Sequence, residues 1–357
     1  MKSISILMTG TGGPGASGYI YSLKNNGERE IRIVGTDVIP EIDPTTLSCL
    51  DAFYVIPRAN TEPYRLKLLE LCQVEHIDVI LPLNTIELAF LSSHREEFLK
   101  IGTRICVLSG EQLEVVNNKA VLLNKLRTLG IETPDFFVVR TIEDFKRAAS
   151  ELGYPNKAIV VKRPDGNGSR GMRFIDPSIS RVDLFLNKKP HSTYVGYEDM
   201  LGLLPAVFEK TALIVMEMLQ GQEYSVDVLV DHGKVESAVC RRVDLIDDSN
   251  DADATIEQKD DVLRYCEQIC EVLQIDGLIG FGIKRNDNAQ PRILEINPRL
   301  QATTILSVVG GVNFPYFAVK KALGEQLRIP RPVEGIRVLQ RKQRVFFTDN
   351  GSILMKL

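Results

Sequence analysis

Histidine is scarce in this chain of 357 residues, and its cysteines follow no metal-binding pattern. Its four histidines lie far apart, and none has a Ser or Cys nucleophile beside it; they are His76, His94, His191 and His232. The six cysteines lack the paired spacing of zinc sites, so we expect buried thiols in a reducing compartment and a cytoplasmic protein. Both absences disfavour a zinc enzyme and a Ser-His-Asp hydrolase.

Long apolar runs and an excess of either charge are also missing. No run approaches the roughly 20 apolar residues of a membrane span. The first residues lead into a strand and a glycine turn instead of a signal peptide. Lys and Arg number 43 and Asp and Glu 47, a net charge of −4, so neither nucleic acid nor membrane is expected as a partner. The length and composition suit a soluble globular protein of two or three domains.

The first 115 residues predict a nucleotide-type α/β unit. A buried strand at 4–8 is followed by a glycine-rich turn at 9–18, a helix, and a strand at 31–35 that leads to Asp37. Dinucleotide-binding turns have this order, but the same glycines also allow a tight turn and close packing of helix on strand. Pro14 removes one backbone donor from the turn. We therefore favour packing, and an NAD(P)-dependent oxidoreductase or sensor remains the alternative from another class.

Further strands at 52–56, 78–83 and 104–108 alternate with amphipathic helices. Ligands bind at the carboxyl ends of the strands in an open parallel sheet. Four polar residues follow strands and are candidate substrate-side residues: Thr9, Asn84, Thr85 and Glu87. Capping of the following helices explains each of them equally well.

A phosphate-binding hairpin is predicted within residues 116–190. Asn118-Lys119 opens a helix, and 158–174 has the pattern of strand, glycine loop and strand. Such a loop can fold its N–H groups over an anion without Cβ clashes, and Lys162 at its base adds a point charge. It is not a Walker loop, because Gly-Lys-Ser/Thr is missing. The alternative is a flexible hairpin with a solvated lysine.

Residues 191–325 predict a second α/β module. A strand at 213–216 breaks at Glu217 and resumes at 224–230. Such a break is either an ordinary bulge or a place where backbone groups meet a flat base and Glu223 takes a ribose diol. The hairpin that follows ends at Arg241 and Arg242, and the acidic segment 244–261 predicts a solvated loop or lid.

A short strand at 292–297 carries hard oxygen ligands. Because side chains alternate along a strand, Glu295 and Asn297 should share one face, with Leu294 and Ile296 packed behind them. Such oxygens suit Mg²⁺ (or Mn²⁺), which binds through one or two carboxylates plus substrate phosphates. A surface strand with a salt-bridged glutamate is the alternative.

In this order the segments resemble the ATP-grasp superfamily, most closely its carbamoyl-phosphate-synthetase-like branch of carboxylate–amine ligases. The resemblance rests on residues 6–13, 118–119, 160–164 with the glycine loop, 217–227 and 294–299. It implies an α/β fold with a Rossmann-like N-terminal (pre-ATP-grasp) domain at 1–115 and a two-subdomain ATP-grasp fold. The small subdomain would span 116–190 and the large one 191–325, before a tail at 326–357 that adds an edge strand or contacts a homodimer partner.

The resemblance also implies roles for single residues. The nucleotide phosphates would meet Lys119, Lys162 and the loop with Gly166, Gly168, Ser169 and Gly171. The adenine would meet backbone groups around Glu217, Met218 and Leu219, and the ribose Glu223. Mg²⁺ would be held by Glu295 and Asn297. The catalytic arginines would be Arg299 with Arg241 or Arg242, which hold the transferred phosphate or a substrate carboxylate.

The implied activity is that of an ATP-dependent ligase forming C–N bonds. A small-molecule carboxylate would become an acyl phosphate that an amine attacks, with ADP and phosphate released; Asp227 and Asp244 are the candidate bases. One position departs from the family pattern: Gly282 stands where another metal ligand is usual. A carboxyphosphate-forming or kinase-like enzyme and a catalytically degenerate ATP-binding subunit therefore remain alternatives.

Overall fold

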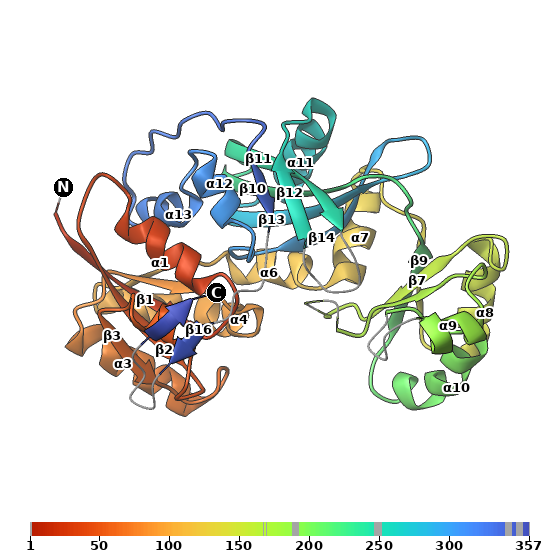
Figure 1. Ribbon diagram of the computed structural model, residues 1–357, viewed down its shortest axis with the longest axis horizontal. Coiled ribbons are helices and arrows are strands. Elements are labelled where there is room, and N and C mark those ends of the chain that lie inside the picture. Colours follow the sequence, from red (N-terminus) through yellow and green to blue (C-terminus); the bar gives the residue numbers. More distant parts are fainter. Residues whose placement is uncertain are drawn as a thin grey trace.

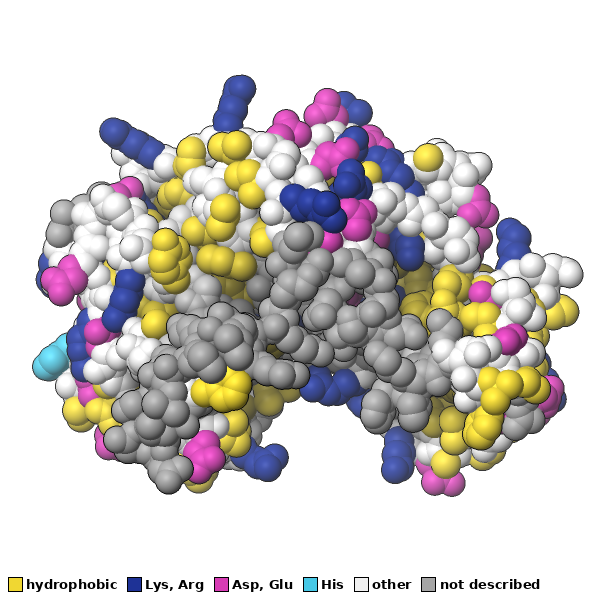
Figure 2. Space-filling model, viewed as in Figure 1, with side chains coloured by type: hydrophobic (Ala, Val, Ile, Leu, Met, Phe, Trp, Pro, Cys, Tyr) yellow, Lys and Arg dark blue, Asp and Glu magenta, His cyan; other side chains and the backbone are white. Residues whose placement is uncertain are grey.

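The computed structural model describes residues 2–166, 168, 170–187, 193–245, 252–339, 345–347 and 353–356. The N-terminal sheet lies at one end of the molecule, the largest sheet in the middle, and a small lobe at the other end (Figure 1). The predicted α/β architecture is confirmed, since a parallel N-terminal sheet precedes two antiparallel sheets. The surface is notched between the N-terminal sheet and the small lobe, and Lys and Arg side chains border this notch (Figure 2).

The N-terminal sheet is parallel and has the strand order β3-β2-β1-β4-β5. Its strands are β1 (Ile4–Thr9), β2 (Ile31–Asp37), β3 (Ala52–Val55), β4 (Val79–Pro82) and β5 (Arg104–Ile105). Its helices are α1 (Ala16–Lys24), α2 (Pro44–Leu47), α3 (Glu62–Val74), α4 (Thr85–Ser93), α5 (Arg95–Lys100) and α6 (Gly110–Val116). Strand β1 is buried except at Ser5, as expected for a strand covered on both faces. β5 is shorter than the predicted strand at 104–108.

Helix α13 (Phe314–Ala322), from the far end of the chain, packs on this sheet. Its Tyr316 and Val319 share a buried cluster with Ile6 of β1 and Leu81 of β4. The same helix contacts strands of the largest sheet. One helix therefore joins the N-terminal sheet to the centre of the molecule.

The small lobe contains a four-stranded antiparallel sheet of order β6-β9-β7-β8. Its strands are β6 (Phe136–Val139), β7 (Ile159–Lys162), β8 (Arg173–Ile175) and β9 (Leu213–Glu217). Helices α8 (Ile142–Glu151), α9 (Arg181–Asn187) and α10 (Tyr197–Phe208) lie in this lobe, whereas α7 (Lys119–Thr128) packs beside α6 in the centre of the molecule (Figure 1). Strands β7 and β8 pair in register across the glycine loop, so the predicted hairpin is confirmed.

The largest sheet is antiparallel, with the order β14-β13-β10-β11-β12-β15. Its strands are β10 (Glu223–Asp231), β11 (Lys234–Leu245), β12 (Ala252–Ile256), β13 (Gly277–Arg285), β14 (Pro291–Asn297) and β15 (Arg337–Leu339). Helices α11 (Asp260–Leu273) and α12 (Ile305–Val309) follow β12 and β14. A separate two-stranded sheet contains β16 (Val345–Phe347) and β17 (Ile353–Lys356).

Strand β12 lies in the acidic segment for which a solvated loop was expected. Ala254 and Ile256 alternate into the core, and the strand pairs with β11. Asp253 is buried, and its carboxylate accepts a hydrogen bond from Arg337 of β15. This bond replaces the water that an exposed carboxylate would bind. The loop prediction is therefore wrong for residues 252–256, and residues 246–251 lie outside the described part of the chain.

Strand β14 contains a bulge that the sequence pattern does not reveal. Gly282 of β13 pairs with Glu295, whereas Ile283 pairs with Ile293, so Leu294 is an extra residue. Leu294 therefore lines a cavity beside Glu295. The expectation that it packs behind the strand together with Ile296 is wrong, because simple alternation is lost at the bulge.

Two expectations from composition bear on the fold. Four of the cysteines are buried as expected, while Cys49 is exposed and Cys106 partly exposed. Among the described helices, none combines the length and the apolar character needed to cross a bilayer.

Candidate active site

A cavity of about 260 Å³ lies between the small lobe and the largest sheet. Separate stretches of the chain form its walls, from β7 and β9 on one side and β10, β13 and β14 on the other. Apolar side chains such as Val160, Phe174 and Met216 line it together with charged ones. Most of the predicted nucleotide-binding residues meet here: Lys119, Lys162, Gly166, Gly168, Glu217, Met218, Leu219, Glu223 and Glu295.

Lys119 is positioned by the start of helix α7. The Asn118 side chain caps this helix by accepting hydrogen bonds from the N–H groups of Ala120 and Val121, at 3.0 and 3.2 Å. The Lys119 N–H donates to the Pro164 carbonyl at 2.8 Å, and its ammonium donates to the Gly166 carbonyl. Lys119 Nζ also lies 3.1 Å from Glu295 Oε2. One lysine thus joins the helix, the glycine loop and the oxygen-rich strand.

Lys162 ends strand β7 and is buried, with 7% of its surface exposed. Its ammonium donates to the Leu294 carbonyl at 3.2 Å, which the bulge in β14 makes available. Burial, together with repulsion from Lys119, lowers the pKa of Lys162 to about 8, and Glu295 partly opposes this shift. The predicted point charge is therefore fixed in the cavity wall instead of solvated.

The glycine loop leaves β7 in a conformation that larger residues resist. A Cβ at Gly166 would lie 2.7 Å from the Arg170 carbonyl oxygen, too close for any real contact. Gly171 has a φ of +74°, and a Cβ there would meet Arg163 at 2.7 Å. The backbone of this loop can therefore approach a ligand closely. Ser169, predicted to take part, lies outside the described residues.

The segment after β9 is held by backbone bonds to the small lobe. The Glu217 carboxylate accepts a hydrogen bond from the Asp135 N–H at 2.9 Å. The Met218 N–H donates to the Ala158 carbonyl at 3.4 Å. Buried Leu219 follows on the cavity wall. Glu217, Met218 and Leu219 together form this end of the cavity.

Glu223 begins β10 and is paired across the sheet with Lys284 of β13. Lys284 Nζ lies 3.9 Å from Glu223 Oε2, and both side chains line the cavity. Burial raises the pKa of Glu223; Lys284 opposes the rise and Glu295 adds to it.

Glu295 lines the cavity, and Asn297, which is not part of its lining, lies beside it on β14. Asn297 Nδ2 donates to Glu295 Oε1 at 3.0 Å, which leaves the amide oxygen of Asn297 available to a ligand. Although burial acts to raise it, the pKa of Glu295 is lowered, because Lys119, Asn297 and Lys162 stabilise its charge. Gly282 lies directly opposite Glu295 in the sheet and supplies no ligand. One carboxylate and one amide oxygen fit a single Mg²⁺ that also binds phosphates.

Arg299 and Arg242 lie outside the residues that line this cavity. Arg299 Nε donates to Thr85 Oγ1 at 2.9 Å, so it faces the N-terminal sheet. Arg242 is half-exposed and paired with Asp244 and Glu257, at 3.1 and 3.2 Å. Arg299 therefore meets one predicted substrate-side residue, whereas the carboxylates around Arg242 already neutralise its charge.

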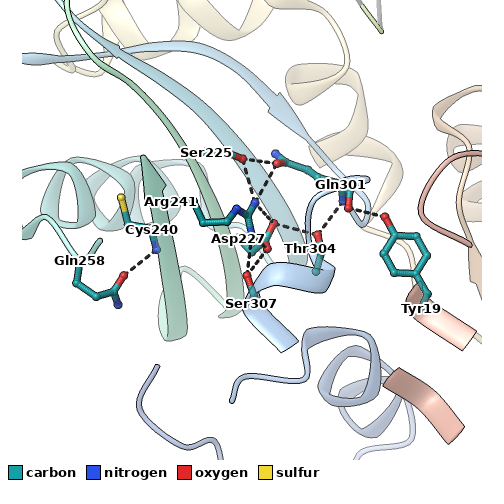
Figure 3. A network of polar contacts seen from close by, with 9 residues as sticks. All are labelled: Tyr19, Ser225, Asp227, Cys240, Arg241, Gln258, Gln301, Thr304 and Ser307. Carbon is teal, nitrogen blue, oxygen red and sulfur yellow. Dashed lines mark hydrogen bonds and ion pairs between the residues drawn. The ribbon is translucent and has the colours of Figure 1, made fainter. Parts of the chain in front are cut away.

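Arg241 takes a position other than the one expected. Its side chain is fully buried and donates to both carboxylate oxygens of Asp227 (Figure 3). The network includes Ser225, Gln301, Thr304 and Ser307, and it reaches Tyr19, whose hydroxyl donates to the Gln301 carbonyl. Arg241 thus holds the loop after β14 in place, and neither it nor Asp227 is free to contact a substrate. The expected roles of Arg241 as a catalytic residue and Asp227 as a base are incorrect in this structure, because the two groups neutralise each other in the core.

The N-terminal glycine turn is filled by the protein's own side chains. A Cβ at Gly10 would lie 1.9 Å from the Asn84 amide nitrogen. Asp37 Oδ2 accepts a hydrogen bond from the Gly12 N–H at 2.8 Å, so this acid is already occupied. Gly15 packs against Ala302 of the loop after β14, and Gly18 packs against Ile305 at the start of α12. Close packing against these neighbours thus explains why glycine stands at these positions.

The remaining substrate-side candidates serve mainly as caps. Glu87 is buried; it accepts from the Asn84 N–H at 3.1 Å and from the Thr9 hydroxyl at 2.7 Å. The bond from the Asn84 N–H belongs to the capping box of α4, and the bond from Thr9 ties this box to β1. The two strands that flank the turn at 286–288 predict that Lys284 and Glu295 lie near one cavity, and both residues line it.

Two family profiles match the chain. Residues 209–344 match the family described as ATP-grasp in the biosynthetic pathway with Ter operon, and residues 6–106 match PylC-like, N-terminal domain. The chain contains an ATP-grasp domain. The predicted resemblance is thereby confirmed, with a PylC-like domain ahead of the ATP-grasp domain.

Among curated proteins, the chain is similar to the carbamoyl phosphate synthase large chain of Agathobacter rectalis. The two are 22% identical over 246 residues, which cover 65% of this chain and 21% of that protein. The chain thus corresponds to about a fifth of the length of such relatives.

Solved structures share the fold of the ATP-grasp domain and of the sheet before it. The biotin carboxylase domain of Hydrogenobacter thermophilus 2-oxoglutarate carboxylase, in complex with MgADP, ADP and bicarbonate, superposes with a TM-score of 0.67 and 17% identity. It covers 93% of this chain and 73% of that one. An L-amino acid ligase from Bacillus licheniformis gives a TM-score of 0.62 at 16% identity and covers 94% and 75%. At these identities the likeness shows the fold.

Proposed function

We propose that this protein is an ATP-dependent ligase that joins a small-molecule carboxylate to an amine through an acyl phosphate. One observation carries the proposal. Lys119, Lys162 and Glu295 come from distant parts of the chain and line one cavity, together with a glycine loop. Two ammonium groups, a close-approaching backbone and a hard oxygen site are what a triphosphate with Mg²⁺ requires.

The comparisons support the same chemistry in related folds. The matched family is an ATP-grasp family, and one structural neighbour is named as an L-amino acid ligase. Another was solved with MgADP. The apolar wall formed by Met218, Leu219 and Phe174 suits a flat base.

In the first step an oxygen of the substrate carboxylate attacks the γ-phosphorus of ATP. The new P–O bond forms as the bond to the β-phosphate oxygen breaks, and ADP leaves. Lys119 and Lys162 hold the phosphates and stabilise the charge that is redistributed, while the glycine loop excludes water. Arg299, which lies outside the nucleotide cavity and donates to Thr85, would hold the acid.

In the second step the amine nitrogen attacks the acyl carbon, inorganic phosphate leaves, and the amine loses a proton to solvent or phosphate. A buried base is not required. Glu295 and Asn297 would hold Mg²⁺, which supplies charge neutralisation for the phosphates when it is bound.

A second candidate is an ATP-binding subunit without ligase activity. Gly282 favours it, because the position opposite Glu295 provides no second carboxylate. Such a subunit would bind ATP and release no ADP with any acceptor.

Hydroxylamine trapping tests the proposal. ADP release is screened over carboxylates and amines, and active carboxylates are repeated with hydroxylamine as the nucleophile. We expect a hydroxamate that depends on ATP and on the carboxylate, and none with Lys162→Ala. ADP release without hydroxamate would instead indicate a kinase-like reaction, and no ADP release with any acceptor would indicate the binding subunit.

A further inference from the structure

Lys284 is a third lysine in the nucleotide cavity, and the proposed chemistry gives it no task. It lies on β13, two residues after Gly282 and on the same face of the sheet. Its side chain is 24% exposed and lines the cavity. Lys119 and Lys162 are accounted for by Glu295, the Gly166 carbonyl and the Leu294 carbonyl.

The strands of the largest sheet pair in such a way that the charged groups of the cavity form two rows, each running from one strand to the next. Glu295 of β14 and Gly282 of β13 are direct partners, which forms the first row. Lys284 of β13 and Glu223 of β10 are direct partners, which forms the second row. Two residues along a strand advance by roughly 7 Å. Lys284 and Glu223 are therefore separated from Glu295, at the metal end of the cavity, by about the length of one sugar unit.

The backbone around the second row is fixed. The Arg285 N–H donates to the Gln222 carbonyl and the Gly221 N–H to the Arg285 carbonyl, both at 3.0 Å. Gln222 Nε2 also donates to the Val243 carbonyl at 2.7 Å. Glu223 and Lys284 thus face each other from strands that are paired up to their ends, and the 3.9 Å between Oε2 and Nζ follows from this pairing.

A half-buried ion pair in an apolar cavity is a poor stabiliser on its own. Desolvation of the two charges opposes their attraction, and an apolar pair of similar size would serve the fold as well. The wall of the same cavity includes the apolar residues Leu219, Met218 and Leu294. Burial also raises the pKa of Glu223, and Lys284 is the group that opposes this. The pair is therefore better explained by a ligand than by stability.

We propose that Lys284 is a positioning residue that directs the ionised Glu223 carboxylate onto the ribose diol, so that the site selects ribonucleotides over deoxyribonucleotides. This inference rests on the proposed binding of ATP in the cavity. An ionised carboxylate accepts hydrogen bonds from both ribose hydroxyls, whereas a protonated one offers fewer acceptors. Lys284 holds one oxygen from the side of β13 and leaves the remaining lone pairs directed into the cavity.

Calorimetric titration with MgADP and Mg-2′-deoxyADP tests this. Wild type should bind ADP roughly ten-fold or more tightly than 2′-deoxyADP, the effect of a hydrogen bond to a charged acceptor. Lys284→Met should reduce this ratio to about one to two-fold, mainly through weaker ADP binding. Lys284→Arg should retain most of the ratio. Lys234→Met, at an exposed lysine paired with Glu236 on the far hairpin, is the matched control and should leave the ratio unchanged.

The outcomes separate this inference from the proposal beneath it. A wild-type protein that binds neither nucleotide contradicts the proposed function itself. Normal ADP binding with an unchanged ratio in Lys284→Met contradicts only the role of Lys284. An equal loss for both nucleotides in Lys284→Met also overturns it, because the lysine then contacts phosphates. If Lys284→Met does not fold, Glu223→Gln provides the second measurement, and an undiminished ratio there refutes the ribose contact.

Discussion

The charge of Lys162 is controlled by its surroundings more directly than that of any other proposed phosphate ligand. Its ammonium is buried, lies near the like charge of Lys119, and has the Leu294 carbonyl as its hydrogen-bond acceptor. A phosphate bound in the cavity would place negative charge near the Lys162 ammonium and would stabilise its protonated form. Binding of nucleotide and binding of a proton to Lys162 should therefore be linked.

The pKa of about 8 for Lys162 predicts how nucleotide affinity depends on pH. Since phosphate favours the charged form, affinity for ADP should be constant below the pKa and fall as pH rises through about 8, approaching ten-fold per unit above it. Binding near that pH should take up protons, measurable by calorimetry in buffers with different ionisation heats. Lys162→Arg should remove the fall, because arginine stays charged. A flat profile in wild type would show that Lys162 does not meet the phosphates.

Arg241 and its neighbour Arg242 should differ sharply in their effect on stability. Arg241→Ala leaves the buried Asp227 carboxylate without its counter-charge, with only the Thr304 and Ser307 hydroxyls as donors, and should lower the free energy of unfolding by about 3–5 kcal/mol. Arg242→Ala removes a half-exposed pair and should cost about 1 kcal/mol or less. Urea unfolding of both variants provides the measurement, with Arg242→Ala as the control. Equal losses would mean that the network of Figure 3 does not stabilise the fold.

Sequence could not distinguish these two arginines. They are adjacent on a strand, so one must face each side of the sheet, but which side is the core depends on the loop after β14. Ser307, Thr304 and Gln301 complete the pocket for Arg241 from 60 or more positions away, and no local pattern announces them. Lys119 and Lys162 were predictable because each stands beside a local signal. The helix cap Asn118 precedes Lys119, and the glycine loop comes after Lys162.

At the scale of elements, the pair of strands β13 and β14 decides what the metal end of the cavity can hold. Gly282 and Glu295 are direct partners, and a Cβ at Gly282 would lie 3.4 Å from Glu295 Cγ, close to ordinary contact. A larger side chain at this position therefore fits. The cavity thus has one carboxylate at this end because glycine has no side chain, although there is space for a larger residue.

Gly282→Glu should add a second metal ligand. Without metal, two carboxylates in direct cross-strand contact repel, so the free energy of unfolding should fall by up to about 1 kcal/mol. Mn²⁺ should reverse the loss and raise the melting temperature more in the variant than in wild type. Gly282→Gln is the uncharged control, and thermal unfolding with EDTA or Mn²⁺ is the measurement. Equal responses of the two variants to Mn²⁺ would contradict a metal site at Glu295.

Most strands were predictable from runs of apolar residues, and the exceptions have physical causes. β4 and β9 follow the predicted segments closely. β12 was missed because its aspartates suggest solvent, whereas Arg337 neutralises Asp253 from a distant strand. The bulge at Leu294 changes no residue type, so its effect on which side chains face the cavity was not visible in the sequence.

At the scale of the whole molecule, the N-terminal sheet is part of the site's support. Gly15 and Gly18 of its glycine turn pack against the loop that follows β14 and the start of α12, and Tyr19 bonds to Gln301 of that loop. Arg299, in the same loop, contacts Thr85 at the start of α4. The turn that resembled a dinucleotide site thus serves to position the loop with Arg299. Distant contacts of this kind were outside the reach of sequence reasoning.

The convergence of Lys119, Lys162, the glycine loop and Glu295 on one triphosphate is tested most directly by calorimetric titration with Mg²⁺ and a non-hydrolysable ATP analogue. One equivalent should bind to wild type, and Lys162→Ala should weaken this binding about ten-fold or more, since a charged contact to phosphate is lost. NAD⁺ and NADP⁺ should give no heat with either protein. Equal affinity in both proteins, or binding of a dinucleotide with no binding of the ATP analogue, would contradict the account.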